Sequence, residues 1–278
     1  MNPHAAHPSS LKALVQSLWN NRSLIYQMAN REVVGRYRGS AMGLMWSFLN
    51  PVFMLTVYTF FFAVVFKSKW GDSGGGSDSK TQFAVILFVG MIVHSLFAEV
   101  ISRAPTLILG NANYVKKVVF PIEILSVISV CAALFHSAIS LLVLAVAFII
   151  FNGFIHPTVL LLPLVFLPYV IFITGVAWML ASLGVYVRDL AQTINVFVTV
   201  LLFLSPVFYS ISAVPVQLQT LIYLNPLTFI IEQSREVLIW GHLPNFVGLF
   251  IYTVVACSVA SLGFFWFQKT RKGFADVL

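Results

Sequence analysis

Charged residues are scarce in this chain of 278 residues: they make up 9% of it, whereas 59% of the residues are hydrophobic. Soluble domains carry about 25% charged residues, so the composition excludes an ordinary soluble domain and indicates a membrane protein. The net charge of +7 comes from basic residues that are too few and too scattered for a nucleic-acid surface. They lie in the short gaps between apolar runs, as signals of membrane topology do.

The chain also lacks the motifs of several enzyme classes. It has no phosphate loop of the G-x-x-x-x-G-K-[ST] type and no H-E-x-x-H. The only cysteines, Cys131 and Cys257, lie in apolar stretches and are interpreted as buried free thiols, not as disulfide or metal ligands. The polar start MNPHAAHPSS does not have the pattern of a cleavable signal peptide, so the spans themselves are expected to insert the chain.

Titratable residues inside the apolar runs are few. Glu99 and Glu123 lie near the ends of runs, where snorkelling or a local partner such as Arg103 suffices to stabilise the charge. His94 and His136 are lone histidines and are predicted to be structural and hydrogen-bonded. A proton-driven transporter needs a buried chain of such groups, so this pattern favours a permease that a separate, cytoplasmic subunit supplies with energy.

Long apolar runs are what the chain has instead. A bilayer core of about 30 Å needs about 20 residues of helix, and NGFIHP divides the long uncharged stretch 124–187 into a hairpin. Residues 67–80, rich in glycine and serine, are interpreted as a flexible aqueous loop. We therefore predict an all-α polytopic membrane protein with six transmembrane helices, near residues 44–66, 83–101, 122–151, 159–187, 191–209 and 246–267.

Six spans place both termini on one side of the membrane. With this topology twelve lysines and arginines lie on the side of the termini and four on the other, namely Lys67, Lys69, Lys80 and Arg235. By the positive-inside rule both termini are then cytoplasmic.

The stretch before the first span is predicted to form an amphipathic helix. Within residues 10–38, Leu11, Leu14, Val15 and Leu18 recur at helical spacing, and arginines are interspersed with Trp19 and Tyr26. This pattern favours a helix lying on the cytoplasmic face of the membrane, although a cytoplasmic helix packed on a partner protein has the same pattern.

Two connecting segments are long enough to contain structure. Residues 103–121 have room for a short helix across the cytoplasmic membrane face, where the energy-supplying subunit would dock; a plain loop is the alternative. Residues 210–245 contain too many prolines and charges to cross lipid and are predicted to form two short helices, re-entrant or on the outer surface. Asn225 and Pro226 have the pattern of a helix cap followed by proline at the first helical position. One face of that helix is predicted to carry Leu227, Ile230, Ile231, Ser234 and Leu238.

An asparagine and a proline interrupt the first apolar run, in RYRGSAMGLMWSFLNPV (residues 36–52). Pro51 is expected to kink the helix, and Asn50 is expected to avoid lipid. Trp46, Phe53 and Phe61 share the face of Asn50, with Tyr58 at its edge, so this face is predicted to point to protein or a wet pathway; lipid contact is the ordinary alternative for single rings. The candidate lining residues are Trp46, Asn50, Phe53, Tyr58, Phe61, Phe197 and Phe203.

Five motifs together resemble those of a known family. They are RYRGSAMGLMWSFLNPV, NANYVKKVVFPIEIL (111–125), VRDL (187–190), NPLT (225–228) and FADVL (274–278). Across nearly its whole length the chain resembles the membrane permeases of ABC transporters that export polysaccharides, especially the O-antigen exporters of Gram-negative bacteria. Exporters of capsule polysaccharide and teichoic acid are close relatives of that group.

The resemblance implies an assembly in the bacterial inner membrane. Two copies of the chain would form a dimer with a channel at its interface, lined by the first and fifth spans. Two copies of a cytoplasmic ABC ATPase would bind ATP and magnesium, and the chain itself would hold no cofactor, metal or catalytic residue. The substrate would be a polysaccharide linked to polyprenyl pyrophosphate.

The resemblance also assigns roles to residues. The loop at 103–121 resembles a coupling helix, with Asn111, Asn113, Tyr114, Lys116 and Lys117 as candidate contacts to the ATPase. The short helices of 210–245 resemble an outer gate, with Asn225, Pro226, Glu232, Arg235 and Glu236 as candidate gate residues. Arg31, Arg36 and Arg38 lie where a lipid pyrophosphate would bind, because a planar guanidinium suits phosphate. Anchoring on anionic lipid, worth about 1 kcal/mol per charge, is the alternative for these arginines.

Two other classes of function compete with this one. A self-powered secondary transporter or flippase needs buried relays or matched interrupted helices in two repeats, and the sequence shows no internal repeat. A membrane-embedded glycosyltransferase or polymerase needs catalytic carboxylates in a sizeable aqueous loop, and only Glu232 and Glu236 approach this requirement.

Overall fold

The computed structural model describes residues 11–65, 79–115 and 120–278, and within these ranges it contains helices and no strand. Five helical segments are long and apolar enough to cross a membrane: Met45–Phe62, Phe83–Leu107, Ile124–Asn152, Pro157–Tyr186 and Phe246–Val277. The predicted all-α class is therefore confirmed, and the chain is a multi-pass membrane protein.

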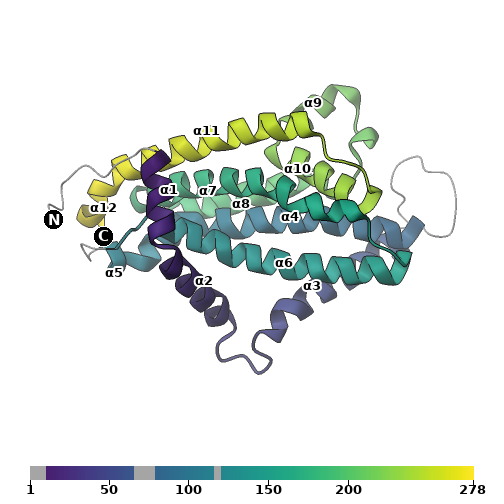
Figure 1. Cartoon of the computed structure of the whole chain (residues 1–278), viewed down its shortest axis with the longest axis horizontal. Helices are drawn as coiled ribbons and strands as arrows, with labels where there is room; N and C mark the ends of the chain where they lie inside the picture. Colours follow the sequence, from purple (N-terminus) through teal and green to yellow (C-terminus); the bar gives the residue numbers. More distant parts are fainter. Residues whose placement is uncertain (1–10, 66–78, 116–119) are drawn as a thin grey trace.

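Helix α4 (Ser79–Leu107) is the centre of the bundle, with α6 (Ile124–Asn152) and α7 (Leu162–Tyr186) packed along it (Figure 1). Its side chains from Phe83 to Val89 are at most 3% exposed. A short 3-10 helix, η3 (Pro157–Leu161), leads into α7. These apolar contacts on several sides make α4 the core of the molecule.

Helix α11 (Phe246–Thr270) runs along α7 on the other side (Figure 1). A Cβ atom at Gly263 would overlap the carbonyl oxygen of Gly175 in α7, so glycine permits this close approach. The outward face of α11 is exposed and includes Cys257, so the prediction that both thiols are buried is wrong for this one; Cys131 is half-buried. Both cysteines are free thiols.

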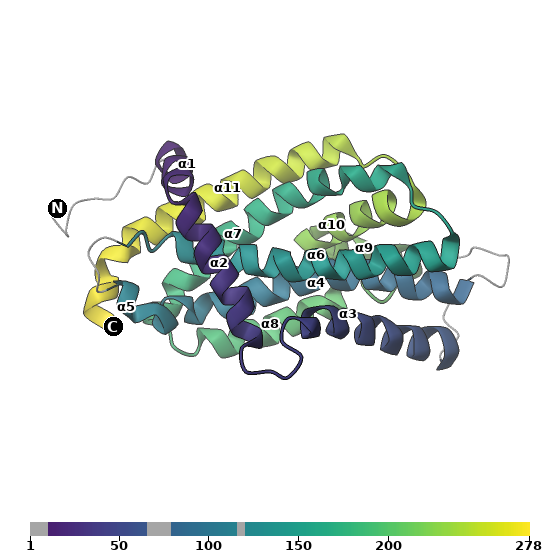
Figure 2. The ribbon, with the colours of Figure 1, turned by 60° about the horizontal axis from the view of Figure 1, so that its bottom comes forward.

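Helix α3 (Met45–Tyr58) lies along one side of the bundle and continues as the π-helix η1 (Thr59–Val65) (Figure 2). Pro51 lies inside α3, where it cannot donate a backbone hydrogen bond. The turn from α2 into α3 contains Gly39 and Gly43 with φ of 86° and 51°, a backbone conformation that favours glycine.

The predicted amphipathic helix at 10–38 is two helices, α1 (Leu11–Asn20) and α2 (Arg22–Tyr37). The helices meet at Asn21, whose side-chain amide donates to the carbonyl of Ser17 and so competes with a continuous helix. Trp19 and Tyr26 are 67% and 74% exposed, as interface residues would be. Contact of these helices with a membrane stays a prediction.

The second span ends later than predicted, at Leu107 instead of residue 101. The charge of Arg103 does not end the helix, because Glu32 of α2 neutralises it. Pro105 lies against Gly184 of α7, where a Cβ atom would overlap the proline carbonyl. The predicted loop at 103–121 is therefore helical at its start and continues as η2 (Leu109–Asn111) and α5 (Ala112–Val115).

The predicted span at 191–209 is shorter than the sequence indicated. Helix α8 (Leu190–Leu204) has 15 residues, fewer than the about 20 that cross a bilayer core. It ends at Ser205, whose backbone is extended (φ −94°, ψ 148°), because Pro206 disfavours a helical conformation in the residue before it. The structure thus has five full-length candidate spans and this shorter apolar helix.

The two short helices predicted in residues 210–245 are present, and their re-entrant or outer position stays a prediction. After η4 (Ile211–Ala213), the chain forms α9 (Val216–Leu224) and α10 (Pro226–Arg235), and α10 continues as η5 (Glu236–Trp240). Asn225 caps α10 by accepting a 3.0 Å hydrogen bond from the amide of Leu227. Leu227, Ile230, Ile231 and Ser234 are buried, as the helical spacing predicted. Leu238, the fifth residue of the predicted face, lies in the π-helix η5 and is half-buried.

The bundle has two distinct ends. Helices α1, α5 and the terminal α12 (Phe274–Val277), which follows η6 (Arg271–Gly273), gather at one end, called here the α5 end (Figure 1). Helix α9 lies toward the opposite end, called the α9 end (Figure 1). Which end faces the cytoplasm stays a prediction.

Candidate functional site

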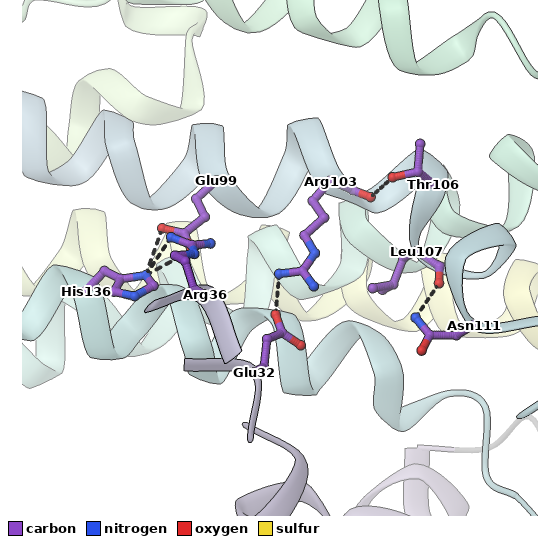
Figure 3. A network of polar contacts seen from close by, with 8 residues as sticks. All are labelled: Glu32, Arg36, Glu99, Arg103, Thr106, Leu107, Asn111 and His136. Carbon is purple, nitrogen blue, oxygen red and sulfur yellow. Dashed lines mark hydrogen bonds and ion pairs between the residues drawn. The ribbon is translucent and has the colours of Figure 1, made fainter. Parts of the chain in front are cut away.

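Five charged or titratable side chains meet between α2, α4 and α6; they are called the polar cluster. They are Glu32, Arg36, Glu99, Arg103 and His136 (Figure 3). Arg36 Nη2 lies 2.6 Å from Glu99 Oε1, and His136 Nδ1 lies 3.0 Å from the same oxygen. Arg103 Nη1 forms an ion pair with Glu32 Oε1. The cluster thus binds α2 to two helices of the bundle.

The sequence contained a signal for this pairing that the analysis of single residues missed. Glu32 and Arg36 are four apart on α2, and Glu99 and Arg103 are four apart on α4, so each pair lies on one helical face. Crosswise pairing places each glutamate beside the arginine of the other helix. Arg103, which the sequence offered as one example of a local partner, thus pairs with Glu32, and Glu99 pairs with Arg36.

Burial is the largest influence on the pKa of Glu32. Burial raises the pKa of this carboxyl group above its usual range, although Arg103 and Arg36 act in the opposite direction. Its side chain is 18% exposed, against 39% for Arg103.

His136 is hydrogen-bonded, but it is not the lone structural histidine that was predicted. Its Nδ1 lies 3.0 Å from the carboxylate of Glu99 and 3.1 Å from Nη1 of Arg36. Nδ1 cannot donate to one and accept from the other at once, so the tautomer of the ring determines which of these two contacts is a hydrogen bond. The other histidine, His94, contacts the carbonyl of Val198 at 3.2 Å, as a structural role predicts.

A cavity of about 200 Å³ opens beside the polar cluster, between α2, α3, α4 and α6. Arg36, Glu99 and His136 form part of its wall. Helix α3 contributes Asn50 and Tyr58, and α6 contributes Ser137. Asn50 lines this cavity and is also exposed, so its predicted contact with protein or a wet pathway stays a prediction.

The other candidate lining residues do not share this cavity. Trp46, Phe53 and Phe61 are 41%, 58% and 46% exposed on the outside of α3 and η1. The π-helix begins at Thr59, so it alters the predicted angular spacing for Phe61 alone among these residues. Phe197 and Phe203 of α8 are likewise more than half exposed.

Aromatic rings nevertheless connect the first span with the segment after α8. Phe208 stacks on Phe62 of η1 at 5.9 Å between ring centroids, and it lies 6.0 Å from the ring of Phe203. The first and fifth predicted spans therefore touch within one chain.

The three candidate headgroup arginines have different surroundings. Arg31 donates to the hydroxyl of Tyr114 at 2.9 Å, and Arg36 is engaged by Glu99 and His136. Arg38 is exposed in the turn after α2. The structure therefore does not gather the three guanidinium groups into one site.

The candidate coupling residues lie at the α5 end, beyond α4. Asn111 donates to the carbonyl of Leu107, Asn113 is exposed, and the ring of Tyr114 stacks on Phe120 at 4.4 Å. Lys116 and Lys117 lie outside the described residues. A short helix in this segment was predicted, and α5 provides one turn of it.

A second ionic site at the α5 end was missed by the sequence analysis; it is called the clasp. Glu123 accepts from Arg271 at 2.8 Å and from the hydroxyl of Ser17 at 2.9 Å. Its backbone carbonyl accepts from the indole of Trp178. The clasp thus joins α1, the start of α6, and the end of α11, which are far apart in the sequence. The sequence feature next to the clasp was the FADVL motif, which follows Arg271 by a few residues. Its Phe274 is fully buried.

The candidate gate residues are held at α10. Arg235 is 1% exposed, so it is a buried cation and not a surface charge. Its guanidinium donates to Glu232 at 2.7 Å and to the carbonyl oxygens of Ile86 and Val207. Burial lowers the pKa of Arg235 to about 10, so the side chain remains charged at neutral pH. Glu236 instead contacts His242 at 2.7 Å.

These features define a polytopic membrane protein in which α2 is bound by ion pairs to α4 of the bundle. Residues 23–239 match the ABC-2 type transporter family, which is most of the chain, so the chain belongs to this family. The match begins in α2 and includes the polar cluster and the short helices α9 and α10.

The curated proteins that it resembles are similar over nearly their full length. The chain is 26% identical over 265 residues to the O-antigen export system permease protein RfbA of Myxococcus xanthus. The aligned region covers 95% of this chain and 98% of that protein. It is 24% identical over 259 residues to the protein of the same name from Klebsiella pneumoniae. It is 22% identical over 222 residues to the polysialic acid transport protein KpsM of Escherichia coli, covering 79% of this chain.

Proposed function

We propose that the chain is the membrane-spanning subunit of an ATP-driven ABC exporter that moves lipid-linked polysaccharide of the O-antigen type out of the cytoplasm. The observation that carries this proposal is the similarity to O-antigen export permeases over at least nine-tenths of both chains. ATP and magnesium belong to a separate ATPase subunit, of which two copies bind at the α5 end. This end faces the cytoplasm, and the α9 end faces the periplasm.

In this proposal the channel forms between two copies of the chain. The first candidate span is only 11% buried within one chain, and α8 buries only Val198 and Leu201. Both helices leave large aromatic side chains exposed, including Trp46, Phe53, Phe197 and Phe203. A second copy that covers these helices would line the channel with their rings, and Asn225 and α10 would form its outer gate.

The polyprenyl pyrophosphate headgroup would approach the turn between α2 and α3. Arg38 is the first candidate contact, since Arg31 and Arg36 already donate to Tyr114 and Glu99. Guanidinium groups bind phosphate with two parallel hydrogen bonds, which an exposed arginine is free to form.

Deletion of the gene is the decisive experiment. Surface O-antigen should be lost, lipid-linked polymer should accumulate in the cytoplasm, and the wild-type gene should restore export. The purified chain should carry an ABC ATPase with it, and lipid-linked glycan should stimulate that ATPase. Normal surface polymer in the deletion strain, or a chain that transports without any ATPase, would overturn the proposal.

Capsule polysaccharide is the second candidate substrate, because the chain is also similar to KpsM. The same deletion strain separates the two: loss of capsule with intact O-antigen assigns the capsule as the substrate. Loss of teichoic acid would assign the third polymer class in the same way.

A further inference from the structure

Arg271 of the clasp binds two acceptors at once. Its guanidinium group donates to the carboxylate of Glu123 at 2.8 Å and to the backbone carbonyl of Phe120 at 3.2 Å. The two side chains of the ion pair are 13% and 8% exposed, so solvent screens the pair only weakly. Neutralising Glu123 does not require the second contact. A hydrogen bond to a main-chain carbonyl instead fixes the path of the chain at Phe120.

The contact at Phe120 continues into α5. The ring of Phe120 stacks on that of Tyr114, with 4.4 Å between the centroids and 18° between the planes. The hydroxyl of Tyr114 accepts a 2.9 Å hydrogen bond from Arg31 of α2. Helix α5 has only four residues, and none of them is buried. A single helical turn is unstable by itself, so the position of α5 depends on such side-chain contacts.

The turn that carries Arg271 is itself fixed on α7. The hydroxyl of Ser182 lies 2.6 Å from that of Thr270, and the hydroxyl of Tyr186 donates to the carbonyl of Thr270 at 2.9 Å. Phe274, at the start of FADVL, is fully buried. Arg271 therefore extends from a turn that is held at several points, and it can hold Phe120 in one place.

We propose that Arg271 is a positioning residue for α5. It fixes the main chain at Phe120 and thereby the ring of Tyr114, so that α5 presents one defined surface to the ATPase. This proposal rests on the proposed function, because it takes α5 as part of the docking site of the ATPase. It also gives the FADVL motif a purpose, since buried Phe274 holds the turn that carries Arg271.

The first test measures the position of α5 in the full chain without the ATPase. A nitroxide label is attached through Asn113→Cys, at an exposed position of α5, after Cys131→Ala and Cys257→Ala have removed the natural thiols. The chain is placed in lipid nanodiscs, and electron paramagnetic resonance measures the mobility of the label. Arg271→Ala should convert most of a restricted spectrum into a mobile one, because losing a hydrogen bond to a charged group shifts a local equilibrium by about tenfold.

Two control variants separate this effect from lost charge and from lost stability. Lys272→Ala removes a positive charge from the exposed neighbour of Arg271. Ser182→Ala removes a buried hydrogen bond from the same turn but leaves both contacts of Arg271. Neither variant should mobilise the label.

A conservative variant covers the case in which Arg271→Ala does not fold. Arg271→Lys keeps a positive charge beside Glu123, so the melting temperature should change little. An ammonium group lacks the planar fork that reaches two acceptors, so this variant should still mobilise the label.

The second test uses the complex with the ATPase and lipid-linked O-antigen extracted from the source strain. The ratio of stimulated to basal ATP hydrolysis should fall by about tenfold in Arg271→Ala, and it should stay constant in Lys272→Ala. Phe120→Ala removes the ring that connects Arg271 with Tyr114. If Arg271 acts through that ring, adding Arg271→Ala to Phe120→Ala should lower the ratio no further.

A mobilised label together with a lowered ratio supports the proposal. It is overturned if Arg271→Ala and Arg271→Lys leave the label restricted, if Ser182→Ala mobilises it equally, or if the ratio is unchanged despite a mobilised label. The label measurement needs neither ATPase nor glycan. A restricted label beside a deletion strain that has lost surface polymer would therefore reject the positioning role alone. A mobilised label in a chain that binds no ATPase would reject the proposed function and the coupling role with it.

Discussion

Helices α3 and α4 are both apolar candidate spans, yet they differ sharply in how the chain uses them. In the apolar 18-residue window of each span, 11% of the residues are buried in the first span and 78% in the span of α4. Their mean hydropathies of 1.3 and 2.3 do not predict so large a difference. Helix α4 is enclosed by other helices, and α3 exposes Trp46, Phe48 and Phe53. The apolar residues of α4 thus pack inside the protein. Those of α3 are exposed and available for contact with lipid or a partner.

The largest effect is expected where α4 meets α7. Gly184→Ala should cost more than about 3 kcal/mol of folding free energy, since its Cβ atom would overlap the backbone carbonyl of Pro105. Size-exclusion profiles and melting temperature in detergent measure this loss. Gly35→Ala in α2 is the control: nothing lies within 4 Å of its Cβ position, so it should be neutral or slightly stabilising. Equal behaviour of both variants would contradict the tight packing of α4.

Two phenylalanines test the comparison of α3 with α4 directly. Phe88 of α4 is 3% exposed and Phe53 of α3 is 58% exposed. Phe88→Ala should cost about 3 kcal/mol, mainly through the cavity that it leaves, and Phe53→Ala should cost less than about 0.5 kcal/mol. Thermal unfolding measures both variants. If Phe53 lines a channel, Phe53→Ala should also reduce polymer export at unchanged protein level, whereas unchanged export would leave lipid contact as its role.

Variants of Arg36 and Arg38 compare an arginine with a structural role with a candidate substrate contact. Arg36→Ala should lower stability by about 1–2 kcal/mol, because Glu99 loses its charged partner. Arg38→Ala should leave the melting temperature and ATPase binding unchanged and abolish export. Surface polymer, melting temperature and co-purified ATPase are the three measurements. Normal surface polymer in the Arg38 variant would reject its headgroup role.

The smallest effect is expected at Tyr114, beyond the end of α4. Tyr114→Phe removes the hydroxyl that accepts from Arg31 but keeps the ring stacked on Phe120. Stability should fall by at most about 0.5 kcal/mol. In the complex with the ATPase, glycan-stimulated ATP hydrolysis should decrease while basal hydrolysis stays constant. An unchanged stimulated rate would indicate that this contact is not used in coupling.

The parts of the fold that local physics controls could be predicted from the sequence. The hydrophobic runs predicted the five long spans, although the second and the last extend six and ten residues further than predicted, and Asn225-Pro226 predicted the cap of α10. The errors lie where contacts between residues far apart in the sequence determine the structure. Helix α4 passes Arg103 only because Glu32 is beside it, and a charge count within one segment does not contain that information.

The candidate site was less predictable for the same reason. Asn50 was recognised as a residue that avoids lipid, but its neighbours in the cavity come from α2, α4 and α6. Glu32 and Glu123 were not expected to bind arginines 71 and 148 positions away in the chain. Only the E-x-x-x-R spacing, shared by α2 and α4, carried a readable sign of such a contact.

The clasp has a consequence for the order in which the protein is assembled. Ser17 and Glu123 are synthesised long before Arg271. During synthesis the carboxylate of Glu123 therefore has no guanidinium partner until Arg271 has been added. Burial of that carboxylate is favourable only after α11 has been inserted. The α5 end therefore closes last, and an incomplete chain would present an open, unpaired acid at the surface where its partner subunit is proposed to bind.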